Sequence, residues 1–254
     1  MGIKRFLSPA ARDFLHDARA AFNKLTGIDF TPYGLYHVSR RRQIILDQLG
    51  IDCTIDAGAN RGQYGGLLRR HGYKGIIHSY EPISSAYKEL QKKIQSDPNW
   101  FAYHCALGEK KETAVVHVSN NSQSSSLLDM TSAHHDADST SMFISDETIN
   151  VVPLDDEFAN ITSGAKRIFL KLDVQGMEMS VMRGAENSLK HIPLVQAELS
   201  FVELYKGESL FLDFVLYMQE RGFRIILLEQ GFSDHRTGYA LQCDLMFLNE
   251  NNRL

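Results

Sequence analysis

Short apolar segments alternate with amphipathic segments along most of the chain. From residue 53 onward the apolar runs have the length of strands, and the segments between them place apolar residues at helical spacing. The predicted strands are 53–57, 75–80, 100–106, 113–118, 167–172, 193–199, 223–229 and 243–248. The predicted helices between them are 63–71, 83–95, 177–190 and 209–221. Apolar strands that alternate with helices are typical of an α/β fold whose parallel sheet is covered on both faces.

The last two predicted strands have no helix between them. A connection of about a dozen residues joins 223–229 to 243–248, which is too short for a parallel crossover with a helix. We therefore expect an open, mostly parallel sheet in which the last strand is antiparallel.

Two further helices are predicted ahead of the first strand. Residues 9–25 carry Phe14, Phe22 and Leu25 at helical spacing, and a second helix is expected from residue 35 to residue 49. Residues 1–50 are thus interpreted as a helical extension of a single domain that spans residues 51–254.

Residues 119–148 interrupt the alternation. They contain nine Ser and three Thr and no Gly, Pro, Lys or Arg. Polar connections of this length are usually lids or disordered segments, so we expect a mobile cover that becomes ordered on binding. Its His134–His135 pair with Asp136 and Asp138 is compatible with a metal site or with a solvated tip, and it lacks the ligand spacings of zinc sites.

Charge is distributed unevenly, although the total is only −4. The first fifty residues hold eight basic and four acidic residues, whereas no basic residue lies between Lys111 and Lys166. The basic extension is compatible with an anionic partner, with a membrane surface, or with a solvated helical face. The total charge indicates no preference for nucleic acid.

The number of cysteines and the hydropathy of the chain indicate the cellular environment in which we expect the protein. Cys53, Cys105 and Cys243 are few, odd in number and far apart, so we expect free thiols in a reducing, cytoplasmic environment. No run approaches the length of about 18 apolar residues that a membrane span needs. The hydrophobic fraction of 43% also excludes a disordered chain.

A glycine-containing turn follows the first predicted strand. Asp56 ends this strand, and Gly58 and Gly62 allow the backbone to approach a ligand closely. The next helix begins at Gln63 and Tyr64, so its free N–H groups are expected to border the same site.

An acid follows the second strand at the position of a ribose-binding residue. Glu81 lies 19 residues after Gly62 and precedes Pro82. An acid about 20 residues beyond a glycine turn accepts hydrogen bonds from a ribose diol in nucleotide-binding sheets. The pattern therefore indicates a cofactor that contains adenosine. Asn60, where a dinucleotide turn has glycine, and Asp56, which would repel a pyrophosphate, favour S-adenosylmethionine over a dinucleotide.

With these motifs the sequence resembles the FkbM family of S-adenosylmethionine-dependent methyltransferases over residues 50–250. The resemblance rests on DAGANRG (56–62), YEP (80–82), ALG (106–108), SSSLL (124–128), VPLDD (152–156), KLDVQGMEMSVMRGAENSL (171–189) and the Pro193–Glu198 pair. It implies a Rossmann-like sheet of seven strands and methyl transfer to hydroxyls of sugars, glycolipids or polyketides.

The resemblance also implies roles for individual residues. Those expected at the cofactor are Asp56, Gly58, Asn60, Gly62, Glu81, Pro82, Ala106 and Leu107. Asp173 and Glu178 fall on the family pattern KxDxEGxE, whose middle acid is Gln175 here. This departure argues against Gln175 as a base. A hydroxyl at Ser126 is compatible with a contact to cofactor or acceptor, or with an ordinary loop start.

Methyl transfer to a hydroxyl requires a group that takes up the proton. Asp173 and Glu198 each follow a central strand, and either can serve as the base. Asp173 is equally compatible with a metal ligand, an anchor for the cofactor's amino group, or the N-cap of a helix near Gly176. Glu178, in the first turn of that helix, is either catalytic or favoured there by the helix dipole.

The leading interpretation is an O-methyltransferase that acts on a small hydroxylated acceptor. An N-methyltransferase of the same fold, a nucleotide-dependent oxidoreductase and a non-catalytic binding module are the alternatives. Oxygen donors at Asp155, Asp156, Asp173 and Glu198 leave a divalent cation, Mg²⁺ or Mn²⁺, open. A homo-oligomer is left open as well.

Overall fold

The structure is a computed structural model that describes residues 8–28 and 37–252. The chain divides into two compact units, residues 1–45 and 46–254. In the first unit α1 (Pro9–Thr26) begins at Ser8, whose hydroxyl accepts a hydrogen bond from the Ala11 N–H, and ends at Gly27 with φ +69°. The predicted boundary at residue 50 stays a prediction. Of the predicted second helix, residues 35 and 36 lie outside the described residues, and α2 spans Val38–Gln48.

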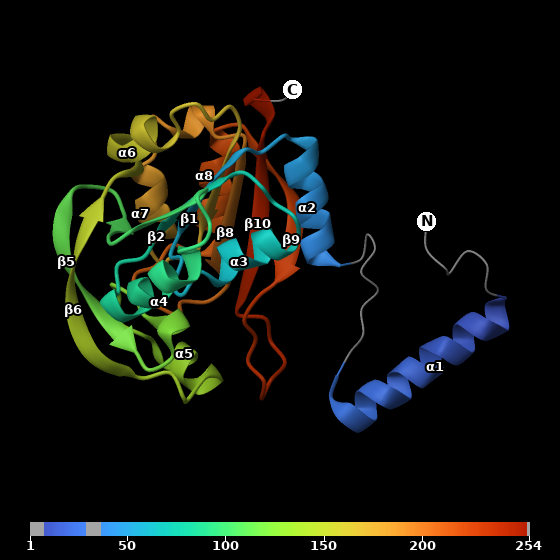
Figure 1. Ribbon diagram of the computed structural model, residues 1–254. Coiled ribbons are helices and arrows are strands. Elements are labelled where there is room, and N and C mark those ends of the chain that lie inside the picture. Colours follow the sequence, from blue (N-terminus) through green and yellow to red (C-terminus); the bar gives the residue numbers. More distant parts are fainter. Residues whose placement is uncertain (1–7, 29–36, 253–254) are drawn as a thin grey trace. The chain divides into compact units, whose positions relative to one another are not determined.

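The second unit is built on a sheet of seven strands (Figure 1). The strands are β1 (Cys53–Ala57), β2 (Ile76–Tyr80), β3 (Trp100–Tyr103), β7 (Ile168–Leu172), β8 (Leu194–Ser200), β9 (Phe223–Gln230) and β10 (Gln242–Asn249). Their order is β3-β2-β1-β7-β8-β10-β9. The first five run parallel, and β10 is antiparallel to both of its neighbours. The predicted Rossmann-like sheet with an antiparallel last strand is therefore confirmed.

The two faces of this sheet differ in chemistry because side chains alternate along each strand. One face places Ile55, Leu170 and Val195 in the main hydrophobic core. The helices α6 (Leu154–Ile161), α7 (Glu178–Arg183) and α8 (Phe211–Glu220) contribute to that core. The other face carries Lys171 and Gln196 beneath α3 (Gln63–Arg70), which crosses in front of the sheet in Figure 1. The helix α4 (Ser84–Ile94) packs against β3.

A smaller sheet, with order β4-β6-β5, stands beside the main one. Its strands are β4 (Ala106–Leu107), β5 (Glu112–Ser119) and β6 (Phe143–Val152). Two predictions are corrected here. The strand predicted at 100–106 is interrupted between β3 and β4, and the strand predicted at 113–118 belongs to this second sheet.

The segment 119–148 contains more regular structure than its composition indicates. It includes a 3₁₀ turn (Ser122–Ser124), α5 (Ser132–Ala137) and the first half of β6. Most polar residues of β6 face solvent, while Ile149 and Val151 pack with Val116 and Ile83 in a second hydrophobic cluster. A strand with one solvent-exposed face has a composition similar to that of a polar loop, so the sequence does not predict β6. Its mobility stays a prediction.

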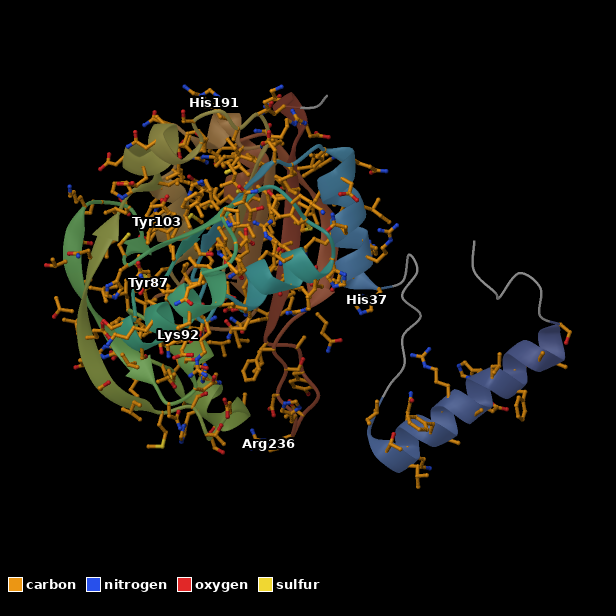
Figure 2. All side chains as sticks on the ribbon, in the orientation of Figure 1. His37, Tyr87, Lys92, Tyr103, His191 and Arg236 are labelled. Carbon is orange, nitrogen blue, oxygen red and sulfur yellow. The ribbon has the colours of Figure 1, made fainter. Side chains whose placement is uncertain are left out.

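The carboxyl ends of the parallel strands define one edge of the molecule. Figure 2 marks this edge by Arg236, in the loop that joins β9 to β10, and the opposite edge by His191, just before β8. Of the helix predicted at 177–190, only residues 178–183 form α7, and the end of the predicted range overlaps a short 3₁₀ turn, Leu189–His191. The described part of the chain closes with a further 3₁₀ turn, Glu250–Asn252.

Candidate active site

The turn after β1 packs directly against the end of β7. Gly58 has φ +74°, and a Cβ atom there would lie 1.8 Å from the carbonyl oxygen of Asp173. Two N–H groups of the turn, those of Gly58 and Ala59, donate to the carbonyl of Tyr80 on β2. Only glycine fits this backbone approach, so the turn holds the ends of β1, β2 and β7 together.

Glu81 is buried at the end of β2 and is bound by two backbone groups. Its Oε2 accepts from the N–H of Asn60 at 2.7 Å, and its Oε1 accepts from the N–H of Ile83 at 2.8 Å. Asn60 has φ +48°, a conformation that turns its N–H toward the acid. Burial raises the pKa of Glu81 to about 7, although both hydrogen bonds oppose that shift.

A pocket of about 710 Å³ opens beside Glu81. Its lining residues are Gly58, Asn60, Glu81, Pro82, Ile83, Ala106, Leu107, Val116, Ser122, Ser125, Ser126, Leu127, Ile149, Asp173, Val174, Gln175 and Met177. Its mixture of an apolar wall with a few polar groups is typical of small-molecule sites. Seven of the residues predicted for the cofactor line it: Gly58, Asn60, Glu81, Pro82, Ala106, Leu107 and Ser126.

The other four residues predicted for the cofactor lie elsewhere. Asp56 is fully buried, 3.1 Å from the Lys171 ammonium. A Cβ at Gly62 would lie 2.8 Å from Leu90, so this glycine serves helix packing. Tyr64 donates its hydroxyl to Gln196 beneath α3, at 2.7 Å.

The last of the four, Gln63, is exposed at the start of α3. No described residue of the first turn of α3 lines the pocket, so the predicted contribution of its N–H groups has no support from this geometry.

Asp173 and Glu198 meet at the carboxyl ends of β7 and β8. The side-chain amide of Gln175 donates one hydrogen bond to Asp173 Oδ1 and one to Glu198 Oε2, each 2.8 Å long. Asp173 also pairs with Lys171 at 3.3 Å, and Glu198 Oε2 accepts a second amide hydrogen bond from Gln242. Burial and the nearby Asp173 carboxylate raise the pKa of Glu198 well above its ordinary value.

A second pocket, of about 580 Å³, adjoins the first because Asp173 and Gln175 line both. Its other lining residues are Asn121, Ser124, His134, Asp138, Glu198, Phe232 and Gln242. Nearly all of them are polar, and neither lysine nor arginine is among them. We call the first cavity the Glu81 pocket and the second the Glu198 pocket.

Sequence reasoning missed most of the Glu198 pocket. Tyr205 donates to Gln175 Oε1 at 2.7 Å, and His134 Nε2 lies 3.4 Å from the same tyrosine oxygen. The prediction of a solvated histidine tip is wrong for His134, which is 4% exposed, and correct for the exposed His135. The residues come from segments far apart in the chain and share no motif, so no local signal could have grouped them.

Glu178 lines neither pocket. Its carboxyl oxygens accept from the N–H groups of Val174 and Gly176, at 2.9 and 3.1 Å, and thereby fix the loop that carries Gln175. Burial raises the pKa of Glu178 to about 7. The alternative of Asp173 as a helix N-cap is wrong, because α7 begins after Met177.

The remaining candidate metal ligands lie apart from this edge. The Asp155 carboxylate accepts hydrogen bonds from the N–H groups of Asn187 and Ser188. Within residues 8–28 and 37–252, no group of three or more His, Cys, Asp or Glu side chains is placed to hold a metal ion. No helix in the described part of the chain has the length and hydropathy needed to cross a membrane.

The model of the methyltransferase FkbM domain matches residues 56–225, while no curated protein matches the chain. Among solved structures, an rRNA methylase from Streptococcus thermophilus is 10% identical, with a TM-score of 0.45 over 84% of this chain and 98% of that one. Magnesium protoporphyrin IX methyltransferase from Synechocystis, solved with bound SAM, is 12% identical, with a TM-score of 0.44 over 92% and 96%.

The family match contains the turn at Gly58, the acid Glu81 and the strand ends that carry Asp173 and Glu198. It covers well over half of the 254 residues. The chain therefore belongs to the FkbM methyltransferase family and is a methyltransferase.

Proposed function

We propose that this methyltransferase uses S-adenosylmethionine and methylates a hydroxyl oxygen of an uncharged, polyhydroxylated small molecule such as a sugar or a sugar-bearing lipid. The observation that carries this proposal is the meeting of two pockets at Asp173 and Gln175. One pocket has the lining of a nucleoside site, and the other is polar and holds a carboxyl group of raised pKa.

The Glu81 pocket fits the nucleoside part of the cofactor. Each Glu81 oxygen accepts one backbone N–H and retains a lone pair, so the two oxygens can accept the two ribose hydroxyls. Leu107, Leu127 and Ile149 form an apolar wall against which an adenine ring can pack. When bound, the cofactor supplies an electrophilic methyl carbon on a sulfonium.

The Glu198 pocket supplies the base. Glu198 Oε2 already accepts two amide hydrogen bonds, whereas Oε1 has no hydrogen-bond partner among residues 8–28 and 37–252. In the proposed reaction Glu198 takes the proton from the acceptor hydroxyl. The freed electron pair on that oxygen forms the new bond to the methyl carbon as the carbon–sulfur bond breaks.

The charges in the Glu198 pocket favour an oxygen acceptor over a nitrogen acceptor. Asp138, Asp173 and Glu198 face the pocket without a lining lysine or arginine, so they would repel an acceptor that carries phosphate or carboxylate. The same carboxylates would keep an amine protonated, and a protonated amine has no electron pair to attack with. A hydroxyl lacks this difficulty and needs the base that is present.

The divalent cation that the sequence left open is not needed in this proposal. A cation between Asp173 and Glu198 would have to displace the Gln175 amide that donates to both carboxylates. We therefore propose transfer without a divalent cation. Treatment of the enzyme with a chelator should leave the rate of methyl transfer within about twofold of the untreated rate. A loss of activity that added Mg²⁺ or Mn²⁺ restores would show that a divalent cation is needed.

The function is tested by incubating the protein with methyl-labelled S-adenosylmethionine and panels of monosaccharides, glycolipids, phosphorylated sugars and amines. We expect label in a methyl ether of an uncharged acceptor. Calorimetry with S-adenosylhomocysteine measures cofactor binding separately. Label found only in N-methyl or phosphorylated products, or no binding of S-adenosylhomocysteine at millimolar concentration, would contradict the proposal.

A further inference from the structure

The backbone of Gln175 has a strained conformation that hydrogen bonds from neighbouring side chains hold in place. Its φ is +52°, a left-handed conformation that costs a residue with a side chain roughly 1 kcal/mol or more. The Ser126 hydroxyl donates to its carbonyl oxygen at 2.6 Å. Glu178 accepts the N–H groups of both neighbouring residues, Val174 and Gly176. Strained backbone that several side chains maintain is characteristic of functional positions.

The side chain of Gln175 makes three hydrogen bonds, which fixes its orientation. Its two N–H groups are donated to Asp173 and Glu198, so its carbonyl oxygen faces Tyr205, which donates to it. Both carboxylates lie 2.8 Å from the same nitrogen. A single amide therefore keeps two acids of the same charge side by side.

The charges around Glu198 favour its neutral form, and they do so even with Gln175 in place. The carboxyl groups packed near it are Asp173, Glu178, Asp244 and Glu208, with Asp138 and the neutral His134 across the pocket. The nearby cation, Lys171, is shared between Asp56 and Asp173. Hydrogen bonds donated to a carboxylate stabilise its charged form, and for Glu198 those bonds come from Gln175 and Gln242.

We propose that Gln175 is a positioning residue for methyl transfer, whose amide holds Glu198 beside Asp173 and stabilises the charged form that accepts the acceptor's proton. This inference rests on the proposed function, because it assigns Glu198 the role of base. The glutamate that the family pattern has at this position could donate at most one hydrogen bond, whereas the Gln175 amide donates to both carboxylates.

Two variants separate the amide from the backbone that carries it. Gln175→Gly removes the side chain, and glycine adopts a φ of +52° without strain, so folding should be retained. Gln175→Glu keeps the length and adds a charge. Gln219→Leu, at an exposed position on α8, is the control for replacing a glutamine.

The readout is the proton affinity of Glu198, measured directly and through the rate. Carboxyl ¹³C NMR, with the Glu198 signal assigned by its loss in Glu198→Gln, gives the titration without an acceptor. We expect the midpoint to rise by about one pH unit in Gln175→Gly and further in Gln175→Glu. The rising limb of the plot of kcat against pH should move to higher pH by the same amount. The control Gln219→Leu should change neither the NMR midpoint nor the kcat profile.

The outcomes distinguish this inference from the function on which it rests. An unchanged Glu198 titration in the folded Gln175→Gly variant would overturn the inference, whatever acceptor is used. A wild-type protein that binds S-adenosylhomocysteine but methylates no hydroxyl would overturn the proposed function while the NMR titration still decides the role of Gln175. Parallel shifts of the titration and of the rate limb would support both.

Discussion

The Glu81 pocket and the Glu198 pocket lie side by side but are built in different ways. The polar centre of the first is one carboxyl group held by two backbone N–H groups, next to a glycine turn that no other residue fits. The centre of the second is a network of side chains, in which Gln175 links Asp173, Glu198 and Tyr205. A site that backbone N–H groups hold together is disturbed by any shift of the backbone. A network of side chains can be altered by substituting one residue at a time.

The largest expected effect separates the two pockets chemically. Glu198→Gln keeps the size of the side chain and removes the base, so kcat should fall about 10²–10⁴-fold. Because Glu198 does not line the Glu81 pocket, the affinity for S-adenosylhomocysteine should stay within about threefold, which is under 1 kcal/mol. Steady-state kinetics and calorimetry check the two halves. An equal loss of cofactor affinity would show that the pockets are not separable.

A backbone change should damage both pockets together. In Gly58→Ala the new Cβ would meet the Asp173 carbonyl at 1.8 Å, so we expect the free energy of unfolding to fall by about 2–4 kcal/mol. Gly207→Ala is the matched control, because Gly207 also has positive φ, +81°, but has nothing within 4 Å of the added Cβ. The control should lose about 1 kcal/mol. Equal losses in denaturant unfolding would mean that the turn accommodates the methyl group.

Removing the acid of the Glu81 pocket should affect binding alone. Glu81→Ala leaves two ribose hydroxyls without their acceptor, at an expected cost of about 1–3 kcal/mol in affinity for S-adenosylhomocysteine. Since the pKa of Glu81 is about 7 and the charged form accepts both hydroxyls, wild-type affinity should rise as the pH is raised from 6 to 8. Calorimetry of Glu81→Gln should show no such rise. A wild-type affinity independent of pH would contradict the assignment.

The smallest effect concerns the free energy of unfolding as a function of pH. Glu81 and Glu178 have native pKa values of about 7, above the value of about 4.3 in an unfolded chain. The native state therefore binds more protons at these two carboxyl groups, which lowers stability as the pH rises through this window. Buried His78, with a native pKa of about 4 against about 6.5 in an unfolded chain, opposes this fall only below about pH 6.5. We expect the melting temperature to drop by a few degrees from pH 5.5 to pH 8. A rise over that range would contradict the raised pKa values.

The sequence predicts the Glu81 pocket better than the Glu198 pocket. The turn after β1 and the acid after β2 are encoded by neighbouring residues, and Gly58, Asn60 and Glu81 indeed lie together. Asp173, Glu198 and Ser126 also lie at the site edge, as the order of strands implies.

The rest depends on contacts between distant segments. His134, Tyr205 and Gln242 meet only after α5, the loop beyond β8 and β10 have packed. From the sequence, Gln175 stands out only as an amide where the family pattern has an acid. Its position between two carboxylates can be recognised only from three-dimensional contacts.

The lone tryptophan of the chain gives the packing of α3 its own optical signal. Trp100 lies against the glycines at the start of α3, and a Cβ at Gly65 would fall 2.3 Å from its ring. Its indole N–H donates to Ser79, whose hydroxyl donates in turn to Asp56 at the end of β1. Fluorescence from this single indole therefore reports on the packing between α3 and the ends of β1 and β2, free of background from any other tryptophan.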